Sequence, residues 1–184
     1  MKLKEITSIS SGVNGRRNPQ GEIYYLGASD FTETHTIDPF IEPALMPSSK
    51  FGKHFLKKGD VIVLAKGHHG FIAHNIIDDS KSMVASSVFM VLKNVVNAVT
   101  PQYIAWYINL KSTQKELRGY SRGTALPAIN RTILGDLDIK IPPLSIQKNI
   151  VAIDELKKRE SKLLKELDCL KTTQLELLLL LNKI

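Results

Sequence analysis

The sequence predicts an α+β protein, in which a domain of mixed strands and helices over residues 1–144 is followed by one long coiled-coil helix over residues 145–184. Three observations support this fold class. Short apolar and β-branched runs, separated by Gly, Pro and Asn turns, fill the first part of the chain. Pro142 and Pro143 end that pattern. The last forty residues contain neither Gly nor Pro, and their apolar positions recur at alternating spacings of four and three.

The apolar positions of the predicted long helix fall into one a/d register that runs from Ile146 to Ile184. Nine of its twelve positions are apolar, and the polar exceptions are Asn149, Glu160 and Gln174. With Ser145 as its N-cap, such a helix is on the order of 55 Å long at about 1.5 Å per residue, longer than a domain of this size needs. The residues expected to make dimer contacts are Ile153, Leu156, Leu163, Leu167, Leu170, Leu177 and Leu181.

This apolar stripe is narrow because charged residues occupy the other faces of the helix, and a narrow stripe favours a second helix as its partner. The chain offers no other helix of this length. The partner is therefore expected to be another copy of the protein or another subunit. In the alternative, residues 177–181 pack against the chain's own core.

Local patterns predict the elements of the domain. Thr100 and Pro101 form an N-cap and first-turn pair for a helix that ends at Gly119. Asn130 is expected to cap a short helix that runs through Leu134. A short opening element ends at residues 10–12, residues 13–21 and most of 27–58 are predicted loops, and strands are expected at residues 22–26, 61–65, 71–77, 87–92 and 137–141.

The chain carries a formal net charge of +7, and the excess is concentrated in one part of the sequence. Between Lys50 and Arg131 there are twelve basic and four acidic residues. Such a positive surface suits a phosphate backbone or an anionic membrane. No apolar run is long enough to span a membrane and the N-terminus lacks a signal peptide, so we expect a cytoplasmic protein without a membrane partner.

The residue patterns of common catalytic and metal sites are missing. No glycine-rich phosphate loop leads into a helix, and the acidic residues are too scattered for a nuclease. His68, His69 and His74 are close in sequence but lack the cysteines or ordered carboxylates that would complete a tetrahedral metal site. We therefore expect no catalytic residue and no metal. An enzyme with an unrecognised site is a minor alternative.

The loops between the predicted strands carry many hydrogen-bond donors. Arg and Lys donate to guanine edges and to phosphates, so these residues are candidates for DNA contact. For any single one, the alternative is an ordinary solvated charge, and the set is more informative than its members. The candidates are Arg16, Arg17, Lys50, Lys53, Lys66, His68, His69, Arg122, Thr124 and Arg131.

Several segments, taken in order, resemble the specificity subunits of type I restriction–modification systems. Each is weak alone, but together they cover nearly the whole chain. The family pattern usually has Glu at the position of Ile146, a difference that affects only a capping detail. The segments are Leu3–Ile6 with Gly12, Leu56–Val63, Lys66-Gly67, Arg122–Asn130, and Leu134–Val151, which contains Pro142-Pro143-Leu144-Ser145-x-Gln147.

This resemblance implies that residues 1–144 form a target recognition domain with a twisted sheet, which recognises a few base pairs in the major groove of double-stranded DNA. Residues 145–184 would be the spacer and dimerisation helix, paired antiparallel with its mate. Family members usually carry two recognition domains and two spacer helices, so this chain resembles a half-size subunit that forms a two-fold homodimer on inverted half-sites.

The resemblance also implies the partners. A DNA methyltransferase subunit, and a restriction or translocase subunit in some systems, would carry S-adenosylmethionine, Mg²⁺ and ATP, and this chain would bind no cofactor itself. A second hypothesis is a coiled-coil assembly protein, or a split fragment that functions only when paired with another specificity subunit.

Overall fold

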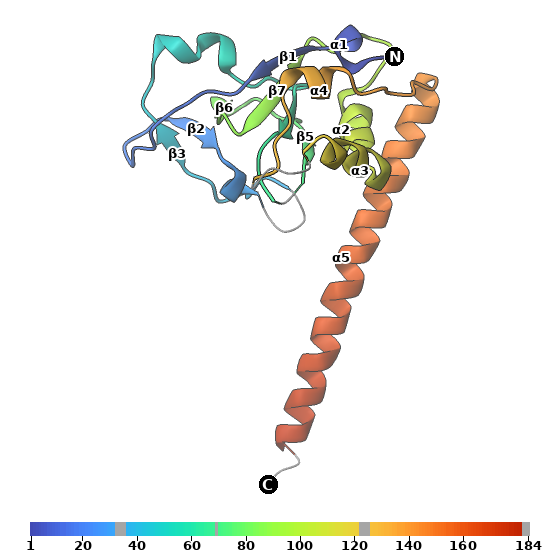
Figure 1. Cartoon of the computed structure of the whole chain (residues 1–184). Coiled ribbons are helices and arrows are strands. Elements are labelled where there is room, and N and C mark those ends of the chain that lie inside the picture. Colours follow the sequence, from blue (N-terminus) through green and yellow to red (C-terminus); the bar gives the residue numbers. More distant parts are fainter. Residues whose placement is uncertain (32–35, 69, 122–125, 182–184) are drawn as a thin grey trace.

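The computed structural model describes residues 1–31, 36–68, 70–121 and 126–181, which form a domain with two small sheets and one long C-terminal helix (Figure 1). The larger sheet has the strand order β1-β7-β4-β5 and the smaller one β3-β2-β6. This architecture confirms the predicted α+β class. The strands are β1 Ser8–Ser11, β2 Ile23–Leu26, β3 Pro43–Leu45, β4 Val61–Leu64, β5 Ala73–Asn75, β6 Met83–Ala85 and β7 Phe89–Lys93.

Strand β4 lies at the centre of the core, and all four of its residues are buried. Val61 and Val63 belong to the cluster that includes the helix residues Ile104 and Ile108. The alternate residues Ile62 and Leu64 belong to a second cluster, which includes Leu26 and Phe89. Because successive side chains point to opposite faces of a sheet, helices cover one face of β4 and the smaller sheet covers the other. The continuous apolar run 61–65 reflects this two-sided burial.

The helices begin where the sequence supplies a cap. Thr100 Oγ1 accepts a hydrogen bond from the Tyr103 amide at 3.2 Å, and Asn130 Oδ1 accepts one from the Ile133 amide at 2.8 Å. Both predicted N-caps are thereby confirmed. The helical elements are α1 Leu3–Ile6, η1 Ala28–Asp30, η2 Ser49–His54, α2 Pro101–Asn109, α3 Lys111–Gly119, α4 Arg131–Gly135 and α5 Leu144–Leu181, of which η1 and η2 are 3₁₀ helices.

Two side-chain amides cover the free edge of β5. Asn109 accepts a hydrogen bond from the Ala73 amide and donates one to the Ala73 carbonyl, each at 2.8 Å. Gln114 makes the same pair of bonds with Phe71, at 3.0 and 2.9 Å. An open strand edge is a template for unwanted pairing. The two amides act here as a substitute for a fifth strand.

Among the described residues, the hydrogen bonds and apolar packing that attach helix α5 to the domain lie near the beginning of the helix. The fully buried Gln147 accepts a hydrogen bond from the Thr100 amide at 2.9 Å, and its own amide group donates to the carbonyls of Ala98 and Pro142 at 2.9 and 2.8 Å. Ile150 and Val151 pack against the main core cluster. This arrangement, which we call the Gln147 clamp, holds the first turns of α5 beside α2.

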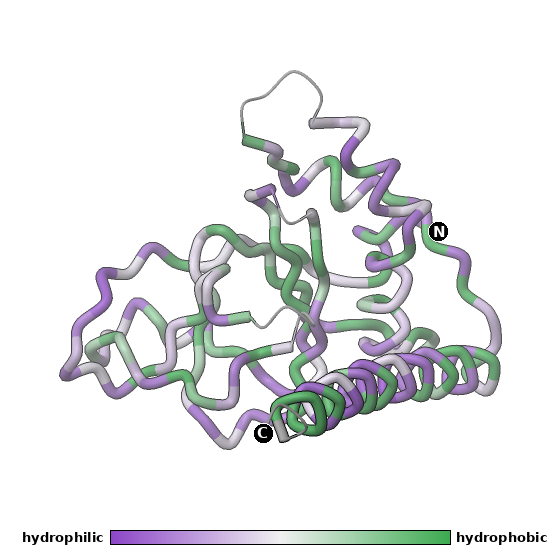
Figure 2. Tube along the Cα trace, turned by 90° about the horizontal axis from the view of Figure 1, so that it is seen from below, coloured by the Kyte–Doolittle hydropathy of each residue, from purple (hydrophilic) through white to green (hydrophobic). Residues whose placement is uncertain are grey.

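Beyond those turns α5 extends away from the domain (Figure 1). Figure 2 shows hydrophobic and hydrophilic residues alternating along it. Leu177–Leu180 are 50–65% exposed. The alternative in which this leucine-rich end packs against the chain's own core is therefore wrong for these residues.

Several predicted boundaries are wrong. Residues 137–141 form no strand: Leu137 and Ile139 are buried in alternation with exposed neighbours, but the backbone pairs only with Met1–Leu3. The alternating pattern reflects burial of an irregular segment. Helix α5 begins at Leu144, so Ser145 lies within its first turn and is not the N-cap.

The single helix predicted up to Gly119 is in fact two helices. Leu110 is extended, with φ −58° and ψ 139°, and separates α2 from α3. The break leaves Gln114 able to bond both Phe71 and the Ile108 carbonyl. Strand β6 is missing from the prediction, and β5 is shorter than predicted.

We predict that Gln147→Leu lowers the free energy of unfolding by about 3 kcal/mol, because one buried amide N–H and two buried carbonyls lose their partner. Urea unfolding followed by fluorescence of Trp106, the only tryptophan, measures the change. The exposed neighbour Lys148 provides the control, since Lys148→Ala should stay within about 0.5 kcal/mol of the wild type. Equal stability of Gln147→Leu and the wild type would contradict a structural role for the clamp.

Candidate nucleic-acid interface

Three chain segments meet where β2, β4 and β6 end. The Ser86 amide donates to the Leu26 carbonyl at 2.8 Å, and the Ala65 amide donates to the Val88 carbonyl at 2.8 Å. A fourth segment joins them, because the Ile129 amide donates to the Ala65 carbonyl at 2.9 Å. We call this region, residues 27–31, 65–68, 86–88 and 126–129, the loop end of the domain.

Two of the predicted DNA-binding residues, Lys66 and His68, are exposed at the loop end. Their loop is held in place by its backbone: Lys66 forms a β-bridge with Ala128, and the Gly67 amide donates to the Pro127 carbonyl at 3.0 Å. Gly67 has φ +137°, a conformation that favours glycine. The Lys66 side chain therefore projects from a backbone that these contacts hold in place.

Arg16 and Arg17 lie in the loop before β2, and both are exposed. Arg17 forms an ion pair with Asp30, donates to the Tyr25 carbonyl at 3.1 Å and lies 5.7 Å from the centre of the Tyr25 ring. Arg17 therefore ties its loop to β2 and η1. Arg16 is the more available of the two donors.

Lys50 and Lys53 lie away from the loop end, and Arg131 lies just beyond it at the start of α4. Lys50 and Lys53 belong to η2, which with α4 lies at the top of Figure 1, whereas β2 points toward the lower part of the domain. Arg131 is the first residue of α4 and lines a depression of about 610 Å³ with residues of α1 and β1. The predicted donors thus fall into two groups on different parts of the domain.

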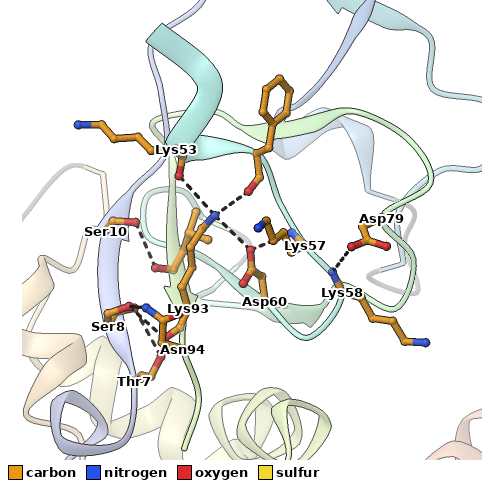
Figure 3. A network of polar contacts seen from close by, with 12 residues as sticks. Thr7, Ser8, Ser10, Lys53, Lys57, Lys58, Asp60, Asp79, Lys93 and Asn94 are labelled. Carbon is orange, nitrogen blue, oxygen red and sulfur yellow. Dashed lines mark hydrogen bonds and ion pairs between the residues drawn. The ribbon is translucent and has the colours of Figure 1, made fainter. Parts of the chain in front are cut away.

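A polar network anchors the segment after η2 to the larger sheet (Figure 3). Lys93 Nζ lies 3.3 Å from a carboxylate oxygen of the buried Asp60 and donates to the Phe55 carbonyl at 2.6 Å. The same carboxylate accepts a hydrogen bond from the Lys57 amide at 2.9 Å. Gly59 at the centre of this turn has φ +92°, so the Lys58-Gly59-Asp60 motif has a structural role.

Three predicted residues, His69, Arg122 and Thr124, lie outside the described residues. The structure also shows a basic cluster on α3, where Arg118, a donor that the sequence also indicates, and the unpredicted Lys111 and Lys115 line a depression of about 630 Å³. Their spacing of four and three residues places them on one helix face. This spacing could have identified the cluster from the sequence.

His74 is a partly buried residue of β5 that packs against an aromatic ring. Its ring packs edge-on against Phe31, with 5.9 Å between ring centres. Burial lowers the pKa of His74, and the nearby positive charge of Lys158 on α5 lowers that pKa further. Within the part of the chain that the structure describes, no group of three or more His, Cys, Asp or Glu residues could hold a metal ion. No described helix is long and apolar enough to cross a membrane.

A family model described as the type I restriction modification DNA specificity domain matches residues 1–167. The chain belongs to this family. Family membership confirms the resemblance seen in the sequence, and specificity subunits of this family are non-catalytic. No curated protein matches the chain.

Three solved structures share the fold of this specificity domain. One, from work on complex assembly and conformational transition of the type I R-M system, has a TM-score of 0.61 at 19% identity over 89% of this chain. The HsdS subunit of Thermoanaerobacter tengcongensis has a TM-score of 0.58 at 18% identity over 89%, and the type I S subunit from M. genitalium 0.55 at 14% over 88%. The matches cover 39%, 38% and 40% of those chains. The specificity domain described here thus spans about two fifths of their length.

The lowered pKa of His74 predicts a dependence of stability on pH. The unfolded chain binds a proton at higher pH than the folded chain does, so the free energy of unfolding should fall as the pH is lowered from 7 to 5. His74→Gln should reduce this slope. Urea unfolding at pH 5, 6 and 7 measures the slopes. An unchanged slope in His74→Gln would argue against this assignment.

Proposed function

We propose that the chain recognises one half of a bipartite DNA site and acts as a homodimer joined by α5 in an antiparallel coiled coil. In this proposal, the dimer directs a methyltransferase subunit, and in some systems a restriction or translocase subunit, to the site. Family membership supports a role in DNA specificity. The two-fold arrangement and the partner subunits are part of the proposal.

The observation that carries the proposal is an unpaired apolar seam on a helix whose direction is fixed. Ile153, Leu163, Leu170 and Leu177 are 54–68% exposed. A helix that merely completed its own domain would bury such residues. An apolar stripe of this length instead favours a partner helix.

For DNA contact we propose the loop end, with Lys66 and His68 as donors and Arg16 as an additional contact. A fixed backbone reduces the entropy that these side chains lose on binding. The basic cluster on α3 and the residues of η2 are suited to phosphate contact, which positions a protein without specifying sequence. Arg17 is assigned a structural role because its guanidinium is already paired with Asp30.

The remaining predicted features follow from this role. S-adenosylmethionine, Mg²⁺ and ATP would belong to partner subunits, and the complex would act in the cytoplasm, where the genomic DNA is. The span of about two fifths of the related chains favours a second candidate, in which the chain is a fragment that pairs with a different specificity subunit. The mass of the purified chain in solution distinguishes the two candidates, since only the first gives a dimer of identical chains.

Leu167→Lys combined with Leu177→Lys should convert the dimer into a monomer, because each chain would then place two charges in the apolar seam. Analytical ultracentrifugation measures the mass. Both residues are about half exposed in the single chain, so the domain should stay folded, as Trp106 fluorescence can verify. Leu175→Lys, off the seam, is the matched control and should remain a dimer. A dimer in the double variant would rule out this seam as the interface.

DNA affinity should fall steeply with salt, since the contacts include phosphates. Lys66→Ala should weaken binding about three- to tenfold to a duplex carrying the recognised site, and Lys148→Ala on the outer face of α5 should not. Fluorescence anisotropy at several salt concentrations measures both effects, after sequencing of methylated genomic sites has identified the duplex. Equal affinity of Lys66→Ala and the wild type for DNA would contradict the assignment of the loop end to the DNA interface.

A further inference from the structure

The a/d seam of α5 is accessible along its described length. Ile146 and Asn149, near the domain, are exposed, as are Leu156 and Leu177 farther along. The contacts of α5 with the domain use other positions, chiefly Gln147 and its neighbours. A second helix can therefore lie along the seam from its first turn without displacing the domain.

We propose that two copies pair antiparallel in one particular register, in which Asn149 of each copy faces Gln174 of the other. The inference rests on the proposed homodimer and adds the residues that select its geometry. In this register Ile146 faces Leu177, Ile153 faces Leu170 and Leu156 faces Leu167. The two helices then overlap over almost their full length.

The polar residues of the seam support this register. Asn149 and Gln174 are the two amides among the seam positions, and here they meet and can hydrogen-bond each other. A shift by one heptad in one direction places Gln174 against Leu156, and a shift in the other direction places Asn149 against Leu167. Each shift leaves an amide without a partner in an apolar layer, and a buried polar group at one seam position is known to select register.

The charges beside the seam support the same register. Arg159 and Glu166 flank it, and the register brings Arg159 of each copy close to Glu166 of the other, twice per dimer. Both residues are exposed, and Glu166 otherwise lies 3.7 Å from Lys162 of its own helix. A parallel pair would instead place Glu160 opposite Glu160, two like charges in one layer of the seam, whereas the antiparallel register places each Glu160 opposite Leu163 of the other copy.

The leucine-rich end gives a third argument. Leu178 and Leu180 lie off the seam and are exposed, which a simple two-helix pair does not explain. In the proposed register they lie level with residues 143–145 of the other copy, where Leu144 and Ile146 are exposed at the base of the domain. The apolar end of each helix thus meets apolar surface on its partner.

The register fixes the distance between the two domains. The two Gln147 clamps would lie about 44 Å apart along the helix axis, at about 1.5 Å per residue. This separation equals about 13 base pairs at about 3.4 Å each. The register therefore sets the distance between the two clamps, and with it the separation of the two domains along the helix axis.

Disulfide trapping tests the register directly. In the full chain with Cys169→Ser, the pair Asn149→Cys and Gln174→Cys should form a covalent dimer under mild oxidation. Asn149→Cys alone should not, because the two copies of residue 149 lie at opposite ends of the pair. Crosslinking by Asn149→Cys alone would indicate a parallel pair, and no crosslinking by the double variant would indicate another register. Either result overturns the proposal.

Charge reversal provides a second test. Arg159→Glu and Glu166→Arg should each weaken the homodimer about tenfold, because two attractive pairs become repulsive. An equimolar mixture of the two variants should recover wild-type affinity, since the mixed dimer restores both pairs. A mixture as weak as its components overturns the register. If the wild-type chain sediments as a monomer, the homodimer itself fails, whereas a wild-type dimer without crosslink or recovery contradicts only the register.

Discussion

The direction of α5 depends on one buried amide. The Gln147 side chain has one acceptor and two donor hydrogens, and all are used by backbone groups of two segments: residues 98–100, which lead into α2, and Pro142 before α5. Apolar packing alone would hold the first turns of the helix but would tolerate small rotations. Hydrogen bonds from a buried group depend on distance and angle, so they fix orientation as well as position. The hydrogen bonds of Gln147 therefore determine where the far end of α5 lies relative to the domain.

Side-chain amides also bond to backbone groups at the edge of the larger sheet. Asn109 and Gln114 pair with the backbone of Ala73 and Phe71 as a neighbouring strand would. In each case an amide side chain supplies a donor and an acceptor where regular backbone pairing ends, which a hydroxyl or a carboxylate cannot do with the same geometry. Amide side chains thus complete the hydrogen bonding at both the β5 edge and the joint with α5, and α2 lies between the sheet and α5.

Features governed by local chemistry could be predicted from the sequence. The caps at Thr100 and Asn130, the apolar strand β4 and the long helix depend on neighbouring residues, and the structure has them where the pattern indicates. Features set by distant partners could not. Strand β6 has three residues and exists because β2 pairs with it in parallel, and the break at Leu110 has no proline or glycine to mark it. Of the candidate contacts, the sequence identifies the basic loops and groups Lys66 with His68, but the pairing of Arg17 with Asp30 and the pairing of the Lys66 loop with residues 127–128 depend on the fold.

The Gln147 clamp and the apolar seam of α5 are both needed for an assembly with a defined separation between domains. If the far part of α5 pivoted freely, a pair of such helices could still form, but the attached domains would sample many separations and could not favour one spacing on DNA. If the orientation of the helix were fixed but its seam were polar, the helix would offer no apolar surface for a partner helix to bind. The exposed leucines gain no burial free energy in the single chain, and burial against a partner helix would supply it. In the proposed dimer, the orientation fixed by Gln147 at one end and the exposed apolar stripe along the rest of α5 would act together as a spacer between recognition domains.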